Sequence, residues 1–157
     1  MSRVLIVEDE GLVARSLART LVLHGHEAVA CVATGAEAIA QALAGVPDVV
    51  LMDIHLRGPM DGIEAARQIR AARDLPIVFL SAYSDRDHLE RAKLAGPFAY
   101  LLKPYSDREL LTTIEIVVHK HQLEQQLRER ERWLGTTLRS IGDGVIAVSP
   151  DERVVFL

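Results

Sequence analysis

The sequence predicts an α/β fold, with a doubly wound parallel sheet of five strands, five helices and a long C-terminal helical extension. From Val4 to Val118, short apolar runs alternate with segments whose apolar residues recur at helical spacing. Such alternation produces a parallel sheet that helices cover on both faces. The chain has 157 residues, of which 49% are hydrophobic, so it can form one ordinary domain with a buried core and an extension.

Each expected element rests on a local signal. The strands are the short apolar runs at 4–7, 27–32, 49–52, 76–80 and 98–102. The helices have apolar residues at helical spacing and cover 12–23, 35–44, 63–71, 86–95 and a last segment after Ser106. Thr34 and Glu37 form a capping-box pattern at the start of the second helix, and Gly96-Pro97 ends the fourth. The second to fifth strands look apolar on both faces, so we expect both faces of each to be covered.

Charge and composition exclude several classes of function. The net charge is -4 and no long basic run exists, which argues against direct nucleic-acid binding. Cys31 is the single cysteine, so no intramolecular disulfide can form, and we expect it in the core. No apolar run approaches the roughly 20 residues that span a bilayer, and the acidic start does not resemble a signal peptide. A cytoplasmic protein without membrane contact is expected.

Polar residues follow four of the expected strands. Glu8-Asp9 follows the first strand, Asp53 the third, Ser81 the fourth and Lys103 the fifth. The carboxyl ends of parallel strands meet at one edge of a sheet, where ligands of such folds bind. Taken singly, each residue is more often a turn residue, a helix cap or an exposed lysine. Their joint occurrence at four strand ends favours a site.

The residue types at these strand ends suit phosphoryl transfer. Three carboxylates in one pocket raise each other's pKa, and Mg²⁺ is a cation that compensates such a group. Asp53 could then attack phosphorus as a carboxylate nucleophile. Lys103 would neutralise the phosphoryl oxygens and Ser81 could donate a hydrogen bond to them, which is the positioning and electrostatics that this chemistry requires.

Five motifs resemble one known family. They are Val-Glu-Asp at 7–9, Leu-Met-Asp-Ile at 51–54, Asp-Gly-Ile-Glu-Ala at 61–65, Phe-Leu-Ser-Ala-Tyr at 79–83 and Tyr-Leu-Leu-Lys-Pro at 100–104. Residues 1–120 resemble the receiver domain of two-component signalling. The resemblance implies a flavodoxin-like (βα)5 fold with strand order 2-1-3-4-5, and a sensor histidine kinase or phosphotransfer protein as partner.

The resemblance also implies a role for each matching residue. Asp53 matches the phosphoacceptor. Asp9 and Asp53 match direct Mg²⁺ ligands, Glu8 a ligand through water, and the backbone carbonyl of His55 a further ligand. The His55 side chain departs from the family pattern, because it would overhang the path of the water that attacks the phosphorylated aspartate and so bears on the lifetime of the phosphoryl group.

Further matches concern the response to phosphorylation. Ser81 and Lys103 match the residues that contact the phosphoryl group. Tyr100 matches the aromatic residue that turns inward when Ser81 moves, which changes the face of helix four, strand five and helix five. The bond between Lys103 and Pro104 is expected to be cis.

The segment 121–140 predicts a long signalling helix. It has no proline, and its leucines share a heptad seam with Ile116: Leu123, Leu127, Leu134 and Ile141, interrupted by Arg130 and Thr137. This pattern favours a coiled-coil homodimer through residues 116–141. The alternative is a single solvated helix with pairs such as Glu124–Arg128.

The last segment, 141–157, resembles the opening of a PAS sensor domain. The match is Ile-Gly-Asp-Gly-Val-Ile-Ala-Val at 141–148, and two strands are expected around Ser149-Pro150-Asp151. A complete PAS domain needs about a hundred residues, so the segment is incomplete. The expected output is of the PAS or kinase type, and a longer parent protein could be a receiver–PAS–histidine kinase. The chain itself has no kinase catalytic part and is not expected to be a conventional enzyme.

Other interpretations of the site remain open. An Asp-nucleophile phosphohydrolase of small molecules would share the acids and Mg²⁺, but it usually has a second Asp where His55 stands, and it needs a cap. A flavodoxin-like nucleotide binder would need a Gly/Ser/Thr-rich loop after the first strand, where this chain is acidic. A degenerate receiver used only for docking would not need the complete set of acids and lysine.

Overall fold

The computed structural model describes residues 1–82, 90, 93, 96, 99–140, 147–148 and 154–155. The chain divides into two compact units, Met1–His119 and Lys120–Leu157. The helix expected over 86–95 falls mainly outside the described residues, as do Ile141 and most of the segment that follows it.

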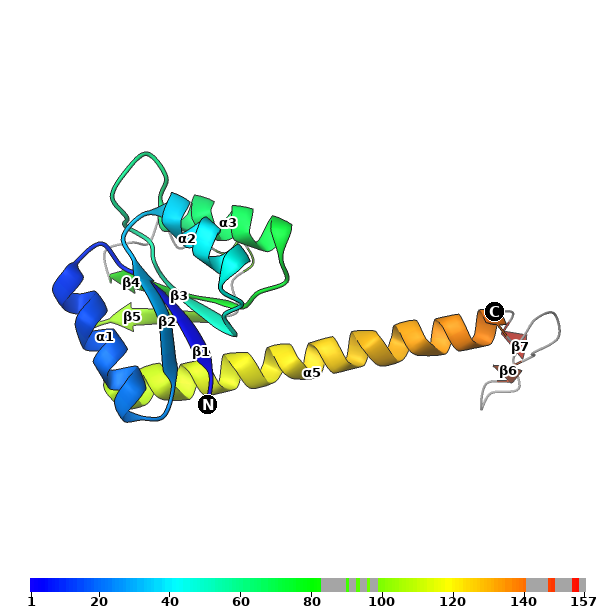
Figure 1. Ribbon diagram of the computed structural model, residues 1–157. Coiled ribbons are helices and arrows are strands. Elements are labelled where there is room, and N and C mark those ends of the chain that lie inside the picture. Colours follow the sequence, from blue (N-terminus) through cyan, green and yellow to red (C-terminus); the bar gives the residue numbers. More distant parts are fainter. Residues whose placement is uncertain are drawn as a thin grey trace. The chain divides into compact units, whose positions relative to one another are not determined.

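The first unit contains a five-stranded parallel sheet (Figure 1). Its strands are β1 (Arg3–Val7), β2 (Glu27–Val32), β3 (Val49–Asp53), β4 (Ile77–Ala82) and β5 (Ala99–Lys103). The order is β2-β1-β3-β4-β5, which confirms the doubly wound fold with strand order 2-1-3-4-5. Because all strands run in the same direction, their carboxyl ends lie at one edge of the sheet.

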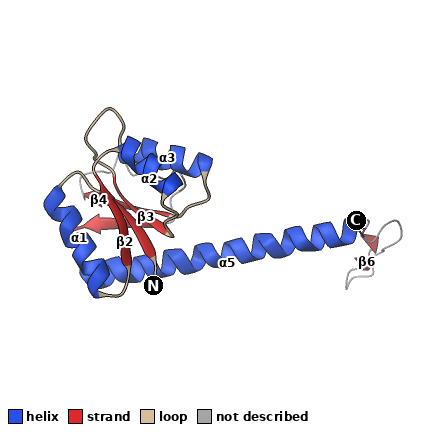
Figure 2. Ribbon diagram, in the orientation of Figure 1, coloured by secondary structure: helices blue, strands red, loops and turns tan. Residues whose placement is uncertain are grey.

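Helices cover both faces of the sheet (Figures 1 and 2). The helices of the first unit are α1 (Gly11–Leu23), α2 (Gly35–Ala44), α3 (Gly62–Ala72) and the beginning of α5 (Asp107–Ser140). Successive residues of a strand point to opposite faces. Accordingly, Val50 and Met52 pack in the core beneath α2 and α3, and Val49 and Leu51 pack in the core beneath α1 and α5.

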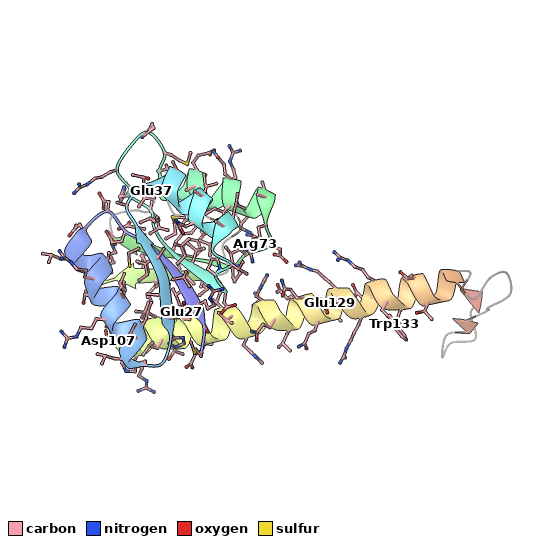
Figure 3. The ribbon with its side chains drawn as sticks, in the orientation of Figure 1. Glu27, Glu37, Arg73, Asp107, Glu129 and Trp133 are labelled. Carbon is pink, nitrogen blue, oxygen red and sulfur yellow. The ribbon has the colours of Figure 1, made fainter. Side chains whose placement is uncertain are left out.

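Local signals set the ends of the helices. At the start of α2, the Thr34 side chain accepts a hydrogen bond from the backbone N–H of Glu37, and the Glu37 carboxylate accepts one from the N–H of Thr34. The predicted capping box is therefore present, with Glu37 at the N-terminal end of α2 (Figure 3). After α3, Arg73 donates from Nη1 to the Ala42 carbonyl at 3.0 Å, which ties the end of α3 to α2.

Two expectations about burial were wrong. β2 and β5 are partly exposed, whereas β1, β3 and β4 are almost wholly buried. The reason is the strand order, because β2 and β5 are the edges of the sheet and have a neighbouring strand on one side only. Cys31 lies on the edge strand β2 and is exposed, so it is not a core residue.

The helix α5 is continuous from Asp107 to Ser140, which confirms the long C-terminal helical extension. Leu110, Ile114 and Val117 are buried against the sheet. In the second unit, Ala147–Val148 (β6) pairs antiparallel with Val154–Val155 (β7), two strands within the segment where two were expected. Among the described residues, no helix has the length and apolar character that a membrane crossing requires.

Candidate functional site

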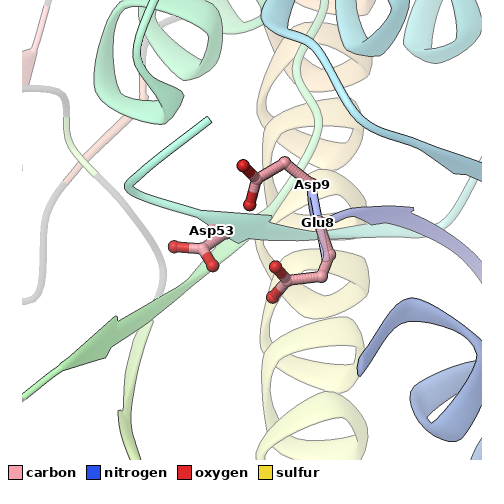
Figure 4. Close-up of side chains that lie close together, drawn as sticks. All are labelled: Glu8, Asp9 and Asp53. Carbon is pink, nitrogen blue, oxygen red and sulfur yellow. The ribbon is translucent and has the colours of Figure 1, made fainter. Parts of the chain in front are cut away.

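Three carboxylates lie together at the carboxyl edge of the sheet. Glu8 and Asp9 directly follow β1, and Asp53 is the last residue of β3. β1 and β3 are neighbours in register, with Val7 opposite Met52. This pairing places one oxygen of each carboxylate within 4.8 Å of the others (Figure 4). Glu8 and Asp53 are 3% and 7% exposed, so two of the acids are largely removed from water.

Lys103, the last residue of β5, supplies a cation to two of these acids. Its Nζ atom donates to Oδ2 of Asp53 at 2.7 Å and to Oε2 of Glu8 at 3.0 Å. Burial lowers the pKa of Lys103, but the hydrogen bonds to Asp53 and Glu8 outweigh it and hold the pKa above its ordinary value. The ammonium group is therefore charged at neutral pH. The peptide bond between Lys103 and Pro104 is cis.

The cluster carries more negative charge than Lys103 can neutralise. Burial raises the pKa of Glu8, and the neighbouring Asp53 raises it further, while the N–H of Glu10, which donates to Oε1 of Glu8 at 3.1 Å, lowers it in part. A crowded group of oxygen ligands suits a hard divalent cation, and Mg²⁺ binds through a few carboxylates together with water and phosphate oxygens. The residues present therefore fit Mg²⁺.

The backbone around Asp53 is held by the start of α3. The N–H of His55 donates to Oδ1 of Asp53 at 3.0 Å, and the N–H of Gly62 donates to the carbonyl of Ile54 at 2.9 Å. A Cβ atom at Gly62 would collide with the carbonyl oxygen of Asp53, so only glycine permits this approach. Sequence reasoning assigned no role to Gly62. An Asp-Gly pair that begins a helix directly after the loop that follows Asp53 was the available signal.

A cavity of about 460 Å³ opens beside the acids. Its described lining consists of Asp9, Glu10, Asp53, His55, Leu56, Arg57, Ala82 and Lys103. Arg57 and Asp9 both line this cavity, and the Nε atom of Arg57 lies 3.4 Å from Oδ2 of Asp9. No role was assigned to Arg57 from the sequence, so this contact was not foreseen.

Ser81 lies on β4 next to Ala82, which lines the cavity, and Tyr100 lies on the neighbouring strand β5. Ser81 is 1% exposed, and its hydroxyl donates to the carbonyl of Ala82 at 3.2 Å. The ring of Tyr100 stacks on Phe79, with 5.9 Å between the ring centroids and 27° between their planes. Within the described part of the chain, the Tyr100 hydroxyl oxygen is buried and has no hydrogen-bond partner.

A family model for the response regulator receiver domain matches residues 4–115. This chain belongs to that family. The receiver resembles the transcriptional regulatory protein PdtaR of Mycobacterium tuberculosis, with 45% identity over 118 residues, and covers 57% of that relative's length. It also resembles the regulatory protein AtoC of Escherichia coli, with 31% identity over 138 residues, and covers 30% of its length. The chain thus spans only part of these curated relatives.

Solved receivers have the same fold. The signal receiver domain of a modulated diguanylate cyclase from Desulfovibrio desulfuricans has 39% identity and a TM-score of 0.75, with 79% of this chain and 98% of that chain covered. The receiver domain of the sensor histidine kinase PA1611 of Pseudomonas aeruginosa has 30% identity and a TM-score of 0.69, with 75% and 98% covered. That receiver holds a magnesium ion in its active-site cleft.

A third solved receiver comes from a multidomain protein. It is the N-terminal domain of a response regulator/sensory box/GGDEF three-domain protein from Carboxydothermus hydrogenoformans. Its identity to this chain is 30% and its TM-score 0.72, with 78% of this chain and 98% of that chain covered. In that protein the receiver is therefore the first of three domains.

Proposed function

We propose that this receiver accepts a phosphoryl group on Asp53 in an Mg²⁺-dependent reaction. The observation that carries the proposal is the contact of the buried Asp53 carboxylate with Lys103 at the rim of an acid-lined cavity. One oxygen of Asp53 is oriented by the N–H of His55 and the other by Lys103, so the nucleophile is positioned before a donor arrives.

The donor class is a phosphohistidine on a sensor histidine kinase or phosphotransfer protein. An Asp53 oxygen attacks phosphorus, an O–P bond forms, and the P–N bond of the donor breaks with its electron pair left on the imidazole nitrogen. The ammonium group of Lys103 already lies 2.7 Å from Asp53. As negative charge develops on the phosphoryl oxygens, it can therefore donate hydrogen bonds to them and stabilise that charge.

The same acids are proposed to hold the metal ion. Asp9 and Asp53 would bind Mg²⁺ directly, Glu8 through water, and His55 through its backbone carbonyl. When bound, Mg²⁺ supplies positive charge to the carboxylates and to the oxygens of the transferred group. The close approach of the three carboxylates and the raised pKa of Glu8 support this assignment.

Intact mass spectrometry after incubation with acetyl phosphate and Mg²⁺ tests the proposal. We expect one added phosphoryl group, lost in Asp53→Asn and retained in Asp107→Asn, which removes an exposed acid at the start of α5. An adduct that persists in Asp53→Asn would contradict the proposal. No adduct in the native chain would indicate a receiver used only for docking, and steady release of phosphate from small esters would indicate a phosphohydrolase.

Ser81 and Tyr100 are proposed to transmit the phosphorylated state. Phosphorylation would draw the Ser81 hydroxyl from the Ala82 carbonyl toward the phosphoryl group. The hydroxyl of the half-buried Tyr100 has no hydrogen-bond partner among the described residues, so no hydrogen bond fixes this side chain in one conformation. NMR spectra with and without beryllofluoride should show shifts that extend to Tyr100 and α5. Shifts confined to the neighbours of Asp53 would count against this role.

The chain is proposed to consist of a receiver at 1–120, a signalling helix at 121–140 and the beginning of a PAS domain at 141–157. The phosphorylated state would pass through the helix to an output domain of the PAS or kinase type. The proposal includes a cytoplasmic location and a homodimer through residues 116–141. Ile116, Leu123, Leu127 and Leu134 are each at least half exposed, and such a row on one helix suits a partner helix. The Carboxydothermus protein, with its receiver before a sensory box, supports this order of domains.

Light scattering of the full chain tests the dimer. We expect the double variant Leu123→Glu/Leu127→Glu to be monomeric, because it places charges on the seam. The control Gln125→Glu/Gln126→Glu adds the same charge to the same helix off the seam and should remain dimeric. A monomeric native chain at high concentration, or a dimer in the seam variant, would remove the helix from the interface.

A further inference from the structure

Two cationic side chains, Lys103 and Arg57, pair with different members of the three acids. Lys103 donates to Glu8 and Asp53, while Arg57 approaches Asp9, with 3.4 Å between Nε and Oδ2. In the part of the chain that the structure describes, Arg57 is the cation paired with Asp9. Asp9 is also the acid that has its side chain most open to solvent, at 25%, and faces the cavity.

The loop that carries Arg57 is fixed by the start of α2. The backbone of Arg57 forms an isolated parallel bridge with Thr34, the N-cap residue of α2. Three residues further on, the Met60 side chain packs so tightly on Gly35 that a Cβ there would lie 2.9 Å from its sulfur. These contacts hold the backbone at Arg57 beside the cavity, so its reach to Asp9 follows from the fold. The side chain itself is 74% exposed and able to move away.

We propose that Arg57 is an internal counter-ion of Asp9 that a divalent cation has to displace, and that it thereby sets the Mg²⁺ affinity of this receiver. The inference rests on the proposed Mg²⁺ site, because Asp9 is its direct ligand there. An oxygen of Asp9 that is paired with the guanidinium is less available to the metal. The positive charge of Arg57 at the cavity also opposes the approach of a dication.

The size of the effect follows from the exposure of the pair. Ion pairs that water reaches contribute little, and Arg57 is mostly exposed, so its displacement is easy. Loss of the pair should therefore tighten Mg²⁺ binding by about two- to fivefold rather than by orders of magnitude. This increase in Mg²⁺ affinity should become smaller as the ionic strength rises, because salt screens exposed charges.

NMR titration of the full chain with MgCl2 tests the inference, with the Asp9 and Asp53 amides as reporters. We expect Arg57→Gln to bind Mg²⁺ about two- to fivefold more tightly than the native chain. Arg67→Gln is the matched control, because it removes the same charge from an exposed arginine that pairs with Glu64 on α3. Its affinity should stay within about twofold of the native value.

A second signal in the same titration reports on Arg57 itself. Its Nε–H resonance, identified by its loss in Arg57→Gln, should shift with the same midpoint as the Asp9 amide. If the native chain binds Mg²⁺ but Arg57→Gln binds no more tightly than Arg67→Gln, or if the Nε–H resonance does not respond, this inference is wrong and the proposed function stands. If the native chain binds no Mg²⁺, the proposed function itself fails.

Discussion

Lys103 and Asp53 are joined by a contact of 2.7 Å between Nζ and Oδ2, although 49 residues separate them in the chain. The contact pairs the buried Asp53 carboxylate with a charged ammonium group. It also explains how buried carboxylates are tolerated at this edge of the sheet, since an uncompensated buried charge is costly.

Lys103→Met should lower the free energy of unfolding in metal-free buffer by about 1–3 kcal/mol. The range lies below that of a fully buried pair because the Lys103 side chain is 31% exposed. Urea denaturation measures the change. Lys120→Met is the control, because its 3.9 Å pair with Glu124 lies on the exposed surface of α5 and should contribute less than about 0.5 kcal/mol. Equal effects of the two substitutions would contradict a special role for Lys103.

Gly62→Ala should destabilise the receiver by about 3 kcal/mol or more, because the new methyl group has to displace the Asp53 carbonyl. It should also slow phosphorylation by acetyl phosphate, since Asp53 moves with its backbone. Gly11→Ala is the control, because a Cβ there meets only the end of the flexible Arg15 side chain at 4.0 Å. That substitution should change stability by less than about 1 kcal/mol. Native-like unfolding and phosphorylation of Gly62→Ala would refute the close-approach argument.

The difference between what sequence predicted and what it missed has a physical cause. Asp53 and Lys103 could be placed together because strand ends in a parallel sheet must meet at one edge, whatever the details of packing. Gly62 and Arg57 could not, because their contacts depend on the path of a loop that periodicity does not describe. Cys31 was assigned to the core from its apolar neighbours, but its exposure depends on which strand is the edge, and only the strand order determines that.

Val46→Gly should stabilise the receiver by about 1 kcal/mol. Val46 has a φ of 49°, a left-handed conformation that a β-branched residue adopts only with strain. Its side chain is 53% exposed, so little burial is lost, and its carbonyl still accepts from Arg3 Nη1. Val22→Gly, in helix α1 and 62% exposed, should lower stability by about 0.5 kcal/mol. Thermal or urea unfolding measures both changes in stability, which we expect to have opposite signs. A loss of stability in both variants would show that Val46 is not strained.

His26 should make the stability of the receiver depend on pH below neutrality. Burial lowers the pKa of His26 from 6.5, the nearby N-terminal amine and His24 lower it further, and Glu115 opposes the shift. In addition, Nδ1 of His26 accepts the N–H of Ser2 at 3.3 Å, which requires that nitrogen to be unprotonated.

The direction of this dependence follows from proton binding. Between the lowered pKa and 6.5, the unfolded chain binds more protons at His26 than the folded chain does. The contribution of neutral His26 to the free energy of unfolding is therefore fully present above about pH 6.5, and it is lost as the pH falls toward the pKa of His26 in the folded chain. Urea unfolding of the native chain and of His26→Gln across this range should give curves that converge at lower pH, because the variant has no such group to titrate. Parallel curves would mean that His26 has the same pKa in both states.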